Sequence, residues 1–184
     1  TTLFRSGDVV RCLSMLGATV TVSDINDERC EEYAALPGVE VVPLDDIYSV
    51  DCDVFMPCAL GGVLNDDTIP LLKAQVVAGC ANNQLLRSEH ADALYARGIL
   101  YAPDFIINAG GIINVSVEVR EQGYNERTAV RKIENIYDGL REVFEKSRRE
   151  NLTPAKAADR VAEFRLEQAR NRNGHHVADG APNS

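Results

Sequence analysis

The 184-residue sequence predicts an α/β protein with a doubly wound parallel sheet and helices at its C-terminal end. Short apolar and β-branched segments alternate with helical segments between residues 19 and 107, which is the pattern of βαβ units. After Gly111 the alternation stops and only helices are expected. Three of the expected strands end in loops of small residues and Asn, and in such folds ligands bind at that edge of the sheet.

Each element has its own local signal. The strands are predicted from runs of Val, Ile, Thr, Tyr and Phe, at 19–23, 39–42, 53–56, 75–79, 99–101 and 105–107. Helices are predicted from apolar spacing and from terminal Gly, Pro and Ser residues, at 9–16, 27–36, 45–50, 68–72 and 88–97, the last with Ser88 as N-cap. A long amphipathic helix is expected at 126–150, ended by Asn151, and Thr153-Pro154 starts the final helix.

The chain is expected to divide into three parts. Residues 1–115 form the sheet-containing domain, with an atypical beginning at 1–17. Residues 116–170 form a C-terminal helical segment, and residues 171–184 form a disordered tail. One hydrophobic core can be buried at this length.

Charge and apolar content exclude several classes of protein. A net charge of −9 argues against nucleic-acid binding, which needs clustered Lys and Arg. No apolar run is long enough for a membrane span and no signal peptide opens the chain, so a cytoplasmic protein is expected. The five cysteines are odd in number and include no CxxC pair, which argues against a zinc site or a disulfide framework and favours buried thiols.

Asp24 is the first candidate binding residue, because it follows a β-branched strand. In a dinucleotide-binding fold an acidic residue at this place hydrogen-bonds the adenosine ribose and repels a 2′-phosphate, which favours NAD over NADP. The other interpretation is that Asp24 caps the helix at 27–36. No GxGxxG turn lies upstream, so the usual contact to a pyrophosphate is missing from the pattern.

The loop at 57–62, with the sequence PCALGG, supplies further candidates. Cys58, Ala59 and Leu60 precede two glycines, and small residues allow a backbone to approach a flat ligand. A tight strand-to-helix turn would explain the same glycines equally well.

Three Asn side chains follow expected strands. Asn82 and Asn83 follow one strand and Asn108 follows another. Carboxamides recognise both carboxamides and ribose hydroxyls, because each has donors and an acceptor. Each Asn could instead cap its own loop. Three such sites on successive strands together favour ligand binding.

No residue is predicted to be catalytic and no metal site is expected. His90 is expected on a helix surface, and His175 and His176 in the tail. The lysines fall on helices, none is embedded in glycines, and no Ser, His and Asp set suggests a nucleophile. The acidic pairs at 45–46 and 66–67 are expected to stabilise turns or helix starts.

Three motifs resemble the leucine/phenylalanine/valine dehydrogenase branch of the Glu/Leu/Phe/Val amino-acid dehydrogenase family. They are PCALGG at 57–62, ANNQL at 81–85 and APDFIINAGGIINV at 102–115, and their order and spacing match as well. The resemblance continues through RKIENIY at 131–137 to TPA at 153–155, and covers residues 17–170.

The resemblance implies a Rossmann-like, NAD-binding domain whose first βα unit is truncated or altered, since the glycine fingerprint is absent. It implies that Asp24 binds the adenosine ribose and that Ala59 and Leu60 pass along the cofactor. It also implies that Asn83 and Asn108 lie near the nicotinamide end. The full predicted cofactor-binding set is Asp24, Cys58, Ala59, Leu60, Asn82, Asn83 and Asn108.

The family performs NAD-dependent oxidative deamination of an apolar L-amino acid, using a substrate domain with two catalytic lysines, one in a glycine-rich segment, and an Asp. This sequence contains none of these residues in such a setting. The resemblance therefore implies the NAD-binding portion of an amino-acid dehydrogenase, inactive alone. The alternative is a stand-alone nucleotide-binding or protein-interaction module derived from that domain. A partner chain that carries the catalytic half is a third option.

A homo-oligomer, with a dimer as one option, is expected because the absence of a substrate domain would expose apolar surface.

Overall fold

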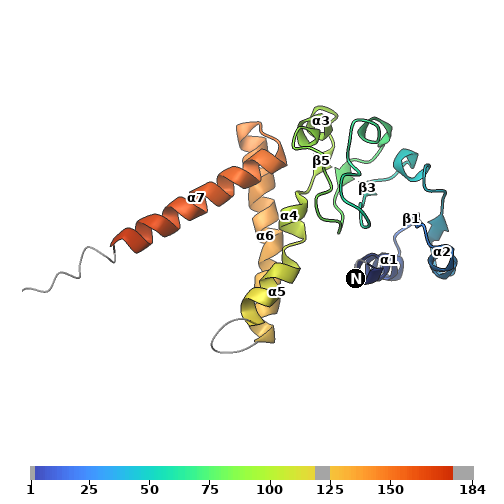
Figure 1. Ribbon diagram of the computed structural model, residues 1–184, viewed down its shortest axis with the longest axis horizontal. Helices are drawn as coiled ribbons and strands as arrows, with labels where there is room; N and C mark the ends of the chain where they lie inside the picture. Colours follow the sequence, from blue (N-terminus) through green and yellow to red (C-terminus); the bar gives the residue numbers. More distant parts are fainter. Residues whose placement is uncertain (1–2, 119–124, 176–184) are drawn as a thin grey trace, which may run out of the picture.

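The computed structural model describes residues 3–118 and 125–175 (Figure 1). Its first half alternates helices and strands: α1 (Leu3–Met15), β1 (Val20–Val22), α2 (Asp27–Ala34), β2 (Val39–Val41), η1 (Ile47–Ser49), β3 (Val54–Phe55), η2 (Ile69–Leu71), β4 (Val76–Val77), α3 (His90–Ala96) and β5 (Leu100–Tyr101). Four helices follow: α4 (Asp104–Ile107), α5 (Gly110–Glu118), α6 (Glu126–Glu150) and α7 (Pro154–His175).

The strands form two parallel sheets. One pairs β1 with β2, and the other has the order β3-β4-β5. The predicted α/β class and parallel pairing are confirmed, whereas the expected single sheet is not found within 3–118 and 125–175. The physical reason lies ahead of β1, because residues 3–15 are helical and supply no strand that could join β1 to β3.

Several predicted boundaries shift. The first helix begins at Leu3 rather than at residue 9, and Gly17, with φ +79°, follows its end as expected. The strands are two or three residues long, shorter than predicted. The sequence predicts Ser88 as the N-cap of α3, and this prediction is wrong because the N-cap residue is Glu89.

The segment 105–107 was expected to be extended, and it is helical. Pro103 precedes the first turn of α4, and its carbonyl accepts the N–H groups of Ile106 and Ile107 at 2.9 and 3.2 Å. Ile106 packs on a buried cluster between α6 and α7, so tertiary packing overrides the β-propensity of Phe and Ile.

The long helix α6 has the predicted bounds, and Asn151 ends it in the left-handed conformation with φ 52°. Thr153 accepts the Lys156 N–H at 3.3 Å with its hydroxyl, so the predicted start of α7 is confirmed. The tail prediction is wrong for residues 171–175, which continue α7, while residues 176–184 lie outside the described residues.

Two buried clusters hold these elements. The larger lies around β3, β4 and β5 and includes Leu64, Val77 and Leu94. The smaller joins α6 to the start of α7. Beyond Val161 the described residues of α7 to position 171 are all exposed, and the helix projects from the molecule (Figure 1).

An ion cluster of Glu150 with Lys146, Arg149 and Arg160 also links α6 with α7. Glu150 accepts hydrogen bonds from Lys146 Nζ at 2.9 Å and from Arg160 at 2.8 Å. These cations lower the pKa of Glu150 to about 2. Across the described ranges, no helix has both the length and the apolar character needed to cross a membrane.

Substitution of Leu64 by Ala should lower the free energy of unfolding. Leu64 is 0% exposed inside the larger cluster, and a large-to-small change at such a site costs roughly 2–5 kcal/mol. Urea denaturation measures the loss. The matched control is Leu71→Ala, because Leu71 is exposed and its removal should cost less than about 1 kcal/mol. Equal losses for both variants would contradict the assigned core.

Candidate functional site

The carboxyl ends of β3 and β4 continue into two loops, 57–62 and 79–83, that lie in direct backbone contact. We call this pair of loops the strand-end platform. The Ala81 N–H donates to the Pro57 carbonyl at 2.9 Å, and the Gly62 N–H donates to the Asn83 carbonyl at 2.8 Å. A Cβ atom on Gly79 would lie 2.1 Å from the Pro57 oxygen, so only glycine permits this approach.

Two carboxamide side chains anchor the loop that follows β4, residues 79–83, by donating hydrogen bonds to its carbonyls. Gln84 is fully buried, and its Nε2 donates to the carbonyls of Gly79 and Ala81 at 2.7 and 2.9 Å. Asn108 Nδ2 donates to the same Ala81 carbonyl at 2.9 Å. Asn108 therefore reaches the platform as predicted, but from the C-terminal end of α4 and not from a strand.

A buried carboxylate fixes the other half of the β4 loop. Asp104, at the start of α4, accepts the Asn83 N–H at 2.5 Å and the Tyr101 hydroxyl at 2.7 Å. Asn83 has φ 53°, a left-handed conformation that Asn adopts more readily than most residues other than glycine. The Asp104 carboxylate fixes the backbone of this residue by accepting its N–H.

The buried Tyr101 hydroxyl titrates above its ordinary range. Burial raises the pKa of Tyr101 from 10.0, and the hydrogen bond to Asp104 raises it further. As the pH rises, the Tyr101 hydroxyl loses its proton in the unfolded chain before it does so in the folded protein. The contribution of Tyr101 to the free energy of unfolding is therefore complete below pH 10 and is lost as the pH rises above 10.

The platform presents most of the predicted loop residues to solvent. Leu60 is 73% exposed, and Ala59, Asn82 and Asn83 are also exposed. Cys58 is half-buried at the base of the same loop. The structure therefore brings together six of the seven predicted residues, counting Asn108, on three adjacent segments.

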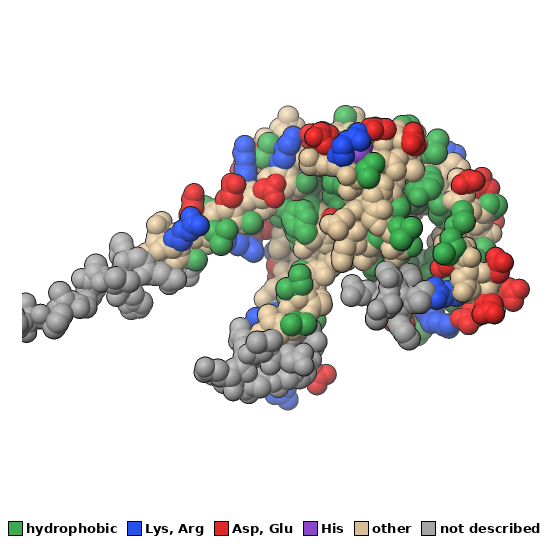
Figure 2. Space-filling model, in the orientation of Figure 1, with side chains coloured by type: hydrophobic (Ala, Val, Ile, Leu, Met, Phe, Trp, Pro, Cys, Tyr) green, Lys and Arg blue, Asp and Glu red, His purple; other side chains and the backbone are tan. Residues whose placement is uncertain are grey.

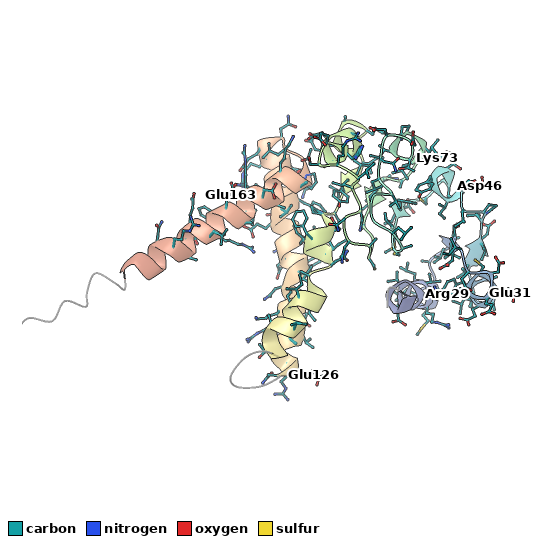
Figure 3. The ribbon with its side chains drawn as sticks, viewed as in Figure 1. Arg29, Glu31, Asp46, Lys73, Glu126 and Glu163 are labelled. Carbon is teal, nitrogen blue, oxygen red and sulfur yellow. The ribbon has the colours of Figure 1, made fainter. Side chains whose placement is uncertain are left out.

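Asp24 belongs to the other sheet, where it follows β1. Its Oδ1 accepts the Asn26 N–H at 3.0 Å, and its Oδ2 lies 3.7 Å from Arg29, a residue of α2 labelled in Figure 3. The cap of α2 is Asn26, whose side chain accepts the Arg29 N–H at 3.0 Å. The alternative prediction that Asp24 itself caps this helix is wrong, although Asp24 orients the residue that does.

The segment ahead of Asp24 contains no strand within residues 3–17. The sequence has no glycine-rich turn ahead of Asp24, and residues 3–17 form no other turn from a strand into a helix. Among the residues in the two described ranges, no group of three His, Cys, Asp or Glu side chains could hold a metal ion.

His90 was expected on a helix surface, and it is buried. Its Nδ1 accepts the Arg87 N–H at 3.0 Å, and its Nε2 lies 3.2 Å from Asp66 Oδ1. The short loop that precedes α3 directs the ring inward, which periodicity could not show. These contacts give His90 a structural role.

Three residues of the site were not predicted: Gln84, Tyr101 and Asp104. All lie within or beside the motifs, yet their side chains point into the protein rather than to solvent. An acidic residue directly after Pro103 in an apolar segment was the available signal, because a buried carboxylate needs nearby donors.

The two parallel sheets, the alternating helices and the platform define an α/β protein whose strand-end loops meet at one edge of a sheet. A family model described as Glutamate/Leucine/Phenylalanine/Valine dehydrogenase matches residues 16–174, and the chain belongs to this family. Leucine dehydrogenase of Geobacillus stearothermophilus is 48% identical over 167 residues, which are 88% of this chain and 45% of that protein. L-tryptophan dehydrogenase of Nostoc punctiforme is 45% identical over 158 residues, 85% of this chain and 44% of that protein.

Solved structures agree with the sequence comparison. The crystal structure of L-tryptophan dehydrogenase from Nostoc punctiforme superposes with a TM-score of 0.84 at 44% identity, over 88% of this chain and 49% of that chain. A hetero-hexameric glutamate dehydrogenase from Thermus thermophilus has a TM-score of 0.60 at 18% identity and shares the fold, over 91% of this chain and 52% of that chain. The chain spans about half the length of the relatives it matches.

Replacing Asp104 by Asn should loosen the platform. The amide presents an N–H group where Asn83 or Tyr101 needs an acceptor, so the free energy of unfolding should fall by about 1–3 kcal/mol. Ultraviolet titration of tyrosine should also show the pKa of Tyr101 moving down toward 10.0, because one of its two main causes is removed.

The control variant is Asp92→Asn, whose exposed carboxylate pairs with Lys156 at 2.7 Å. It should cost less than about 1 kcal/mol and leave the tyrosine titration unchanged. An Asp104→Asn variant as stable as the starting protein would contradict the anchoring role.

Proposed function

We propose that this chain is the NAD-binding portion of an amino-acid dehydrogenase that oxidatively deaminates an apolar L-amino acid. The observation that carries the proposal is the strand-end platform, a rigid surface of small residues and exposed amides at the carboxyl edge of a parallel sheet. Ligands of open α/β sheets bind at that edge. The names of the relatives, leucine and L-tryptophan dehydrogenase, support an apolar amino acid as the substrate.

The donors and acceptors present fit a dinucleotide. Asp24 would accept hydrogen bonds from the adenosine ribose, since Arg29, the cation that pairs with it within residues 3–118 and 125–175, lies a long 3.7 Å away. The backbone at Ala59 and Leu60 would lie along the cofactor, and Asn82, Asn83 and the Asn108 segment near its nicotinamide end. When bound, the nicotinamide supplies the hydride acceptor.

The family's substrate-binding half is the competing assignment. That assignment would require a lysine in a glycine-rich segment beside a cleft. Lys73 and Lys156 are exposed, Lys132 lies on α6, and Lys146 on the same helix pairs with Glu150 at 2.9 Å. The positions of these four lysines favour the cofactor-binding half, and they support the proposal that the chain alone does not deaminate amino acids.

A second candidate function is supported by exposed apolar side chains on α4 and α5. Figure 2 shows hydrophobic side chains over these helices, and Phe105, Ile112 and Val115 are 57%, 77% and 55% exposed. Large apolar surfaces of this kind mark protein interfaces. We propose that this face of α4 and α5 pairs with a second copy of the chain. If the chain is an interaction module that does not bind NAD, the same face is its main interaction surface.

Replacing Ile112 by Glu should therefore reduce self-association. Light scattering on size-exclusion chromatography should show a multiple of the 20.2 kDa chain mass for the starting protein and a lower mass for the variant. The control is Leu166→Glu on the projecting part of α7, where Leu166 is also exposed. A monomeric starting protein would contradict the homo-oligomer.

Isothermal titration with NAD and NADH tests the main proposal. The starting protein should bind NAD, and Asp24→Asn should weaken binding at least about tenfold, since a hydrogen bond from a hydroxyl to a carboxylate contributes about 1.5–3 kcal/mol. The variant should discriminate less against NADP, because the charge that repels the 2′-phosphate is gone.

The matched control is Asp46→Asn, an exposed carboxylate beside η1 that caps nothing through its side chain. It should leave the affinity unchanged. Absence of any NAD or NADH binding would overturn the cofactor role and favour the interaction module. Clear NAD reduction with leucine, valine or phenylalanine by this chain alone would contradict its proposed inactivity.

A further inference from the structure

Two cysteines occupy equivalent places on the strand-end platform. The register of the central sheet pairs Phe55 with Val77, and Cys58 and Cys80 each lie three residues further along. Paired residues of neighbouring parallel strands point to the same face of a sheet. The register therefore places the two thiols side by side at the base of the two loops.

The two cysteines are in contact. The Cys58 thiol lies beside the side chain and the backbone of Cys80. This contact and partial burial raise the pKa of the Cys58 thiol. Both residues are only half-buried, so a small reagent can reach the pair.

The two loops continue paired strands. Neighbouring strands of a sheet generally lie about 4.8 Å apart, and bridged Cα atoms span about 4.4–6.8 Å, so this pairing is compatible with a disulfide. The loops are already held together by the Ala81 to Pro57 hydrogen bond of 2.9 Å and by the close approach of Gly79. A bridge would therefore need little movement of the backbone.

The other three cysteines are placed differently. Cys12 is exposed on α1, and Cys30 donates through its sulfur to the Asp24 carbonyl at 3.6 Å. Cys52 precedes β3 and lies between two aspartates that, with burial, raise the pKa of its thiol. The Cys58–Cys80 contact therefore singles out one pair within the five cysteines.

We propose that Cys58 and Cys80 form a redox-active dithiol that a small-molecule disulfide oxidises to an intramolecular disulfide. The thiolate of Cys80 attacks a sulfur of the reagent RS–SR, because the raised pKa of the Cys58 thiol makes it less acidic than an ordinary thiol, and releases one RS⁻, which takes a proton. The second cysteine loses its proton, attacks the mixed disulfide and releases the second RSH. Two protein thiols are oxidised to one disulfide, and one reagent disulfide is reduced to two thiols.

The proposed modification does not depend on nucleotide binding. It would cross-link the platform immediately before Ala59 on one loop and before Ala81 on the other. The odd cysteine count is compatible with it, because one bridge leaves three thiols.

The test uses the full chain with Cys12→Ser, which removes the exposed thiol most able to link two molecules. The folded protein is incubated with glutathione disulfide, alkylated, and analysed by mass spectrometry with peptide mapping. The four remaining thiols should fall to two, the unalkylated chain should lose about 2 Da, and one peptide pair should join residues 58 and 80.

Matched variants in the same background identify the pair. Cys52→Ser should still form the bridge, whereas Cys58→Ser and Cys80→Ser should form no intramolecular disulfide and acquire at most a mixed disulfide with glutathione. Retention of all four thiols, or a cross-linked peptide pair between other cysteines, would overturn the proposal. The peptide map of the parent decides the outcome even if a Ser variant does not fold.

Discussion

The backbone contact between the loops that follow β3 and β4 is the constraint on which the rest of the site depends. The approach of Gly79 to Pro57 leaves no room for a Cβ atom, and the Ala81 N–H donates to the Pro57 carbonyl at 2.9 Å. Two strands of only two residues each would give a short, weakly held sheet edge. The contact extends their pairing past the strands and turns two loops into one surface.

Buried polar side chains complete this surface. Gln84 and Asn108 donate to the carbonyls of the β4 loop, and Asp104 accepts from the Asn83 N–H. The Gln84 and Asn108 amide nitrogens and the Asp104 carboxylate are paired, and the geometry of such buried pairs specifies one arrangement, although the Gln84 Oε1 atom has no partner among the described residues. A loop anchored at both its carbonyls and its N–H groups keeps exposed amides such as Asn82 in fixed places, which is what recognition of a flat, polar ligand requires.

Membership of the Glu/Leu/Phe/Val dehydrogenase family and the about half-length match to its relatives together define the functional question. A bound dinucleotide would need contacts from both sheets, because Asp24 follows β1 whereas the platform follows β3 and β4. Figure 2 shows acidic side chains over α2, the helix that follows Asp24 in the chain. The exposed apolar side chains of α4 and α5 are a separate feature, because leaving them in water costs free energy.

The sequence by itself determined the α/β class, the parallel pairing, the long helix with its Asn151 end, and the motifs that identify the family, because periodicity, turn residues and motif spacing are local properties. Only the tertiary structure decided that residues 105–107 are helical, since the packing of Ile106 between α6 and α7 outweighs local propensity. It also decided that His90, Gln84 and Asp104 face inward, and that Cys58 meets Cys80. These outcomes depend on contacts between residues 20 or more positions apart or on the direction in which a side chain points. A single stretch of sequence does not specify such contacts or directions.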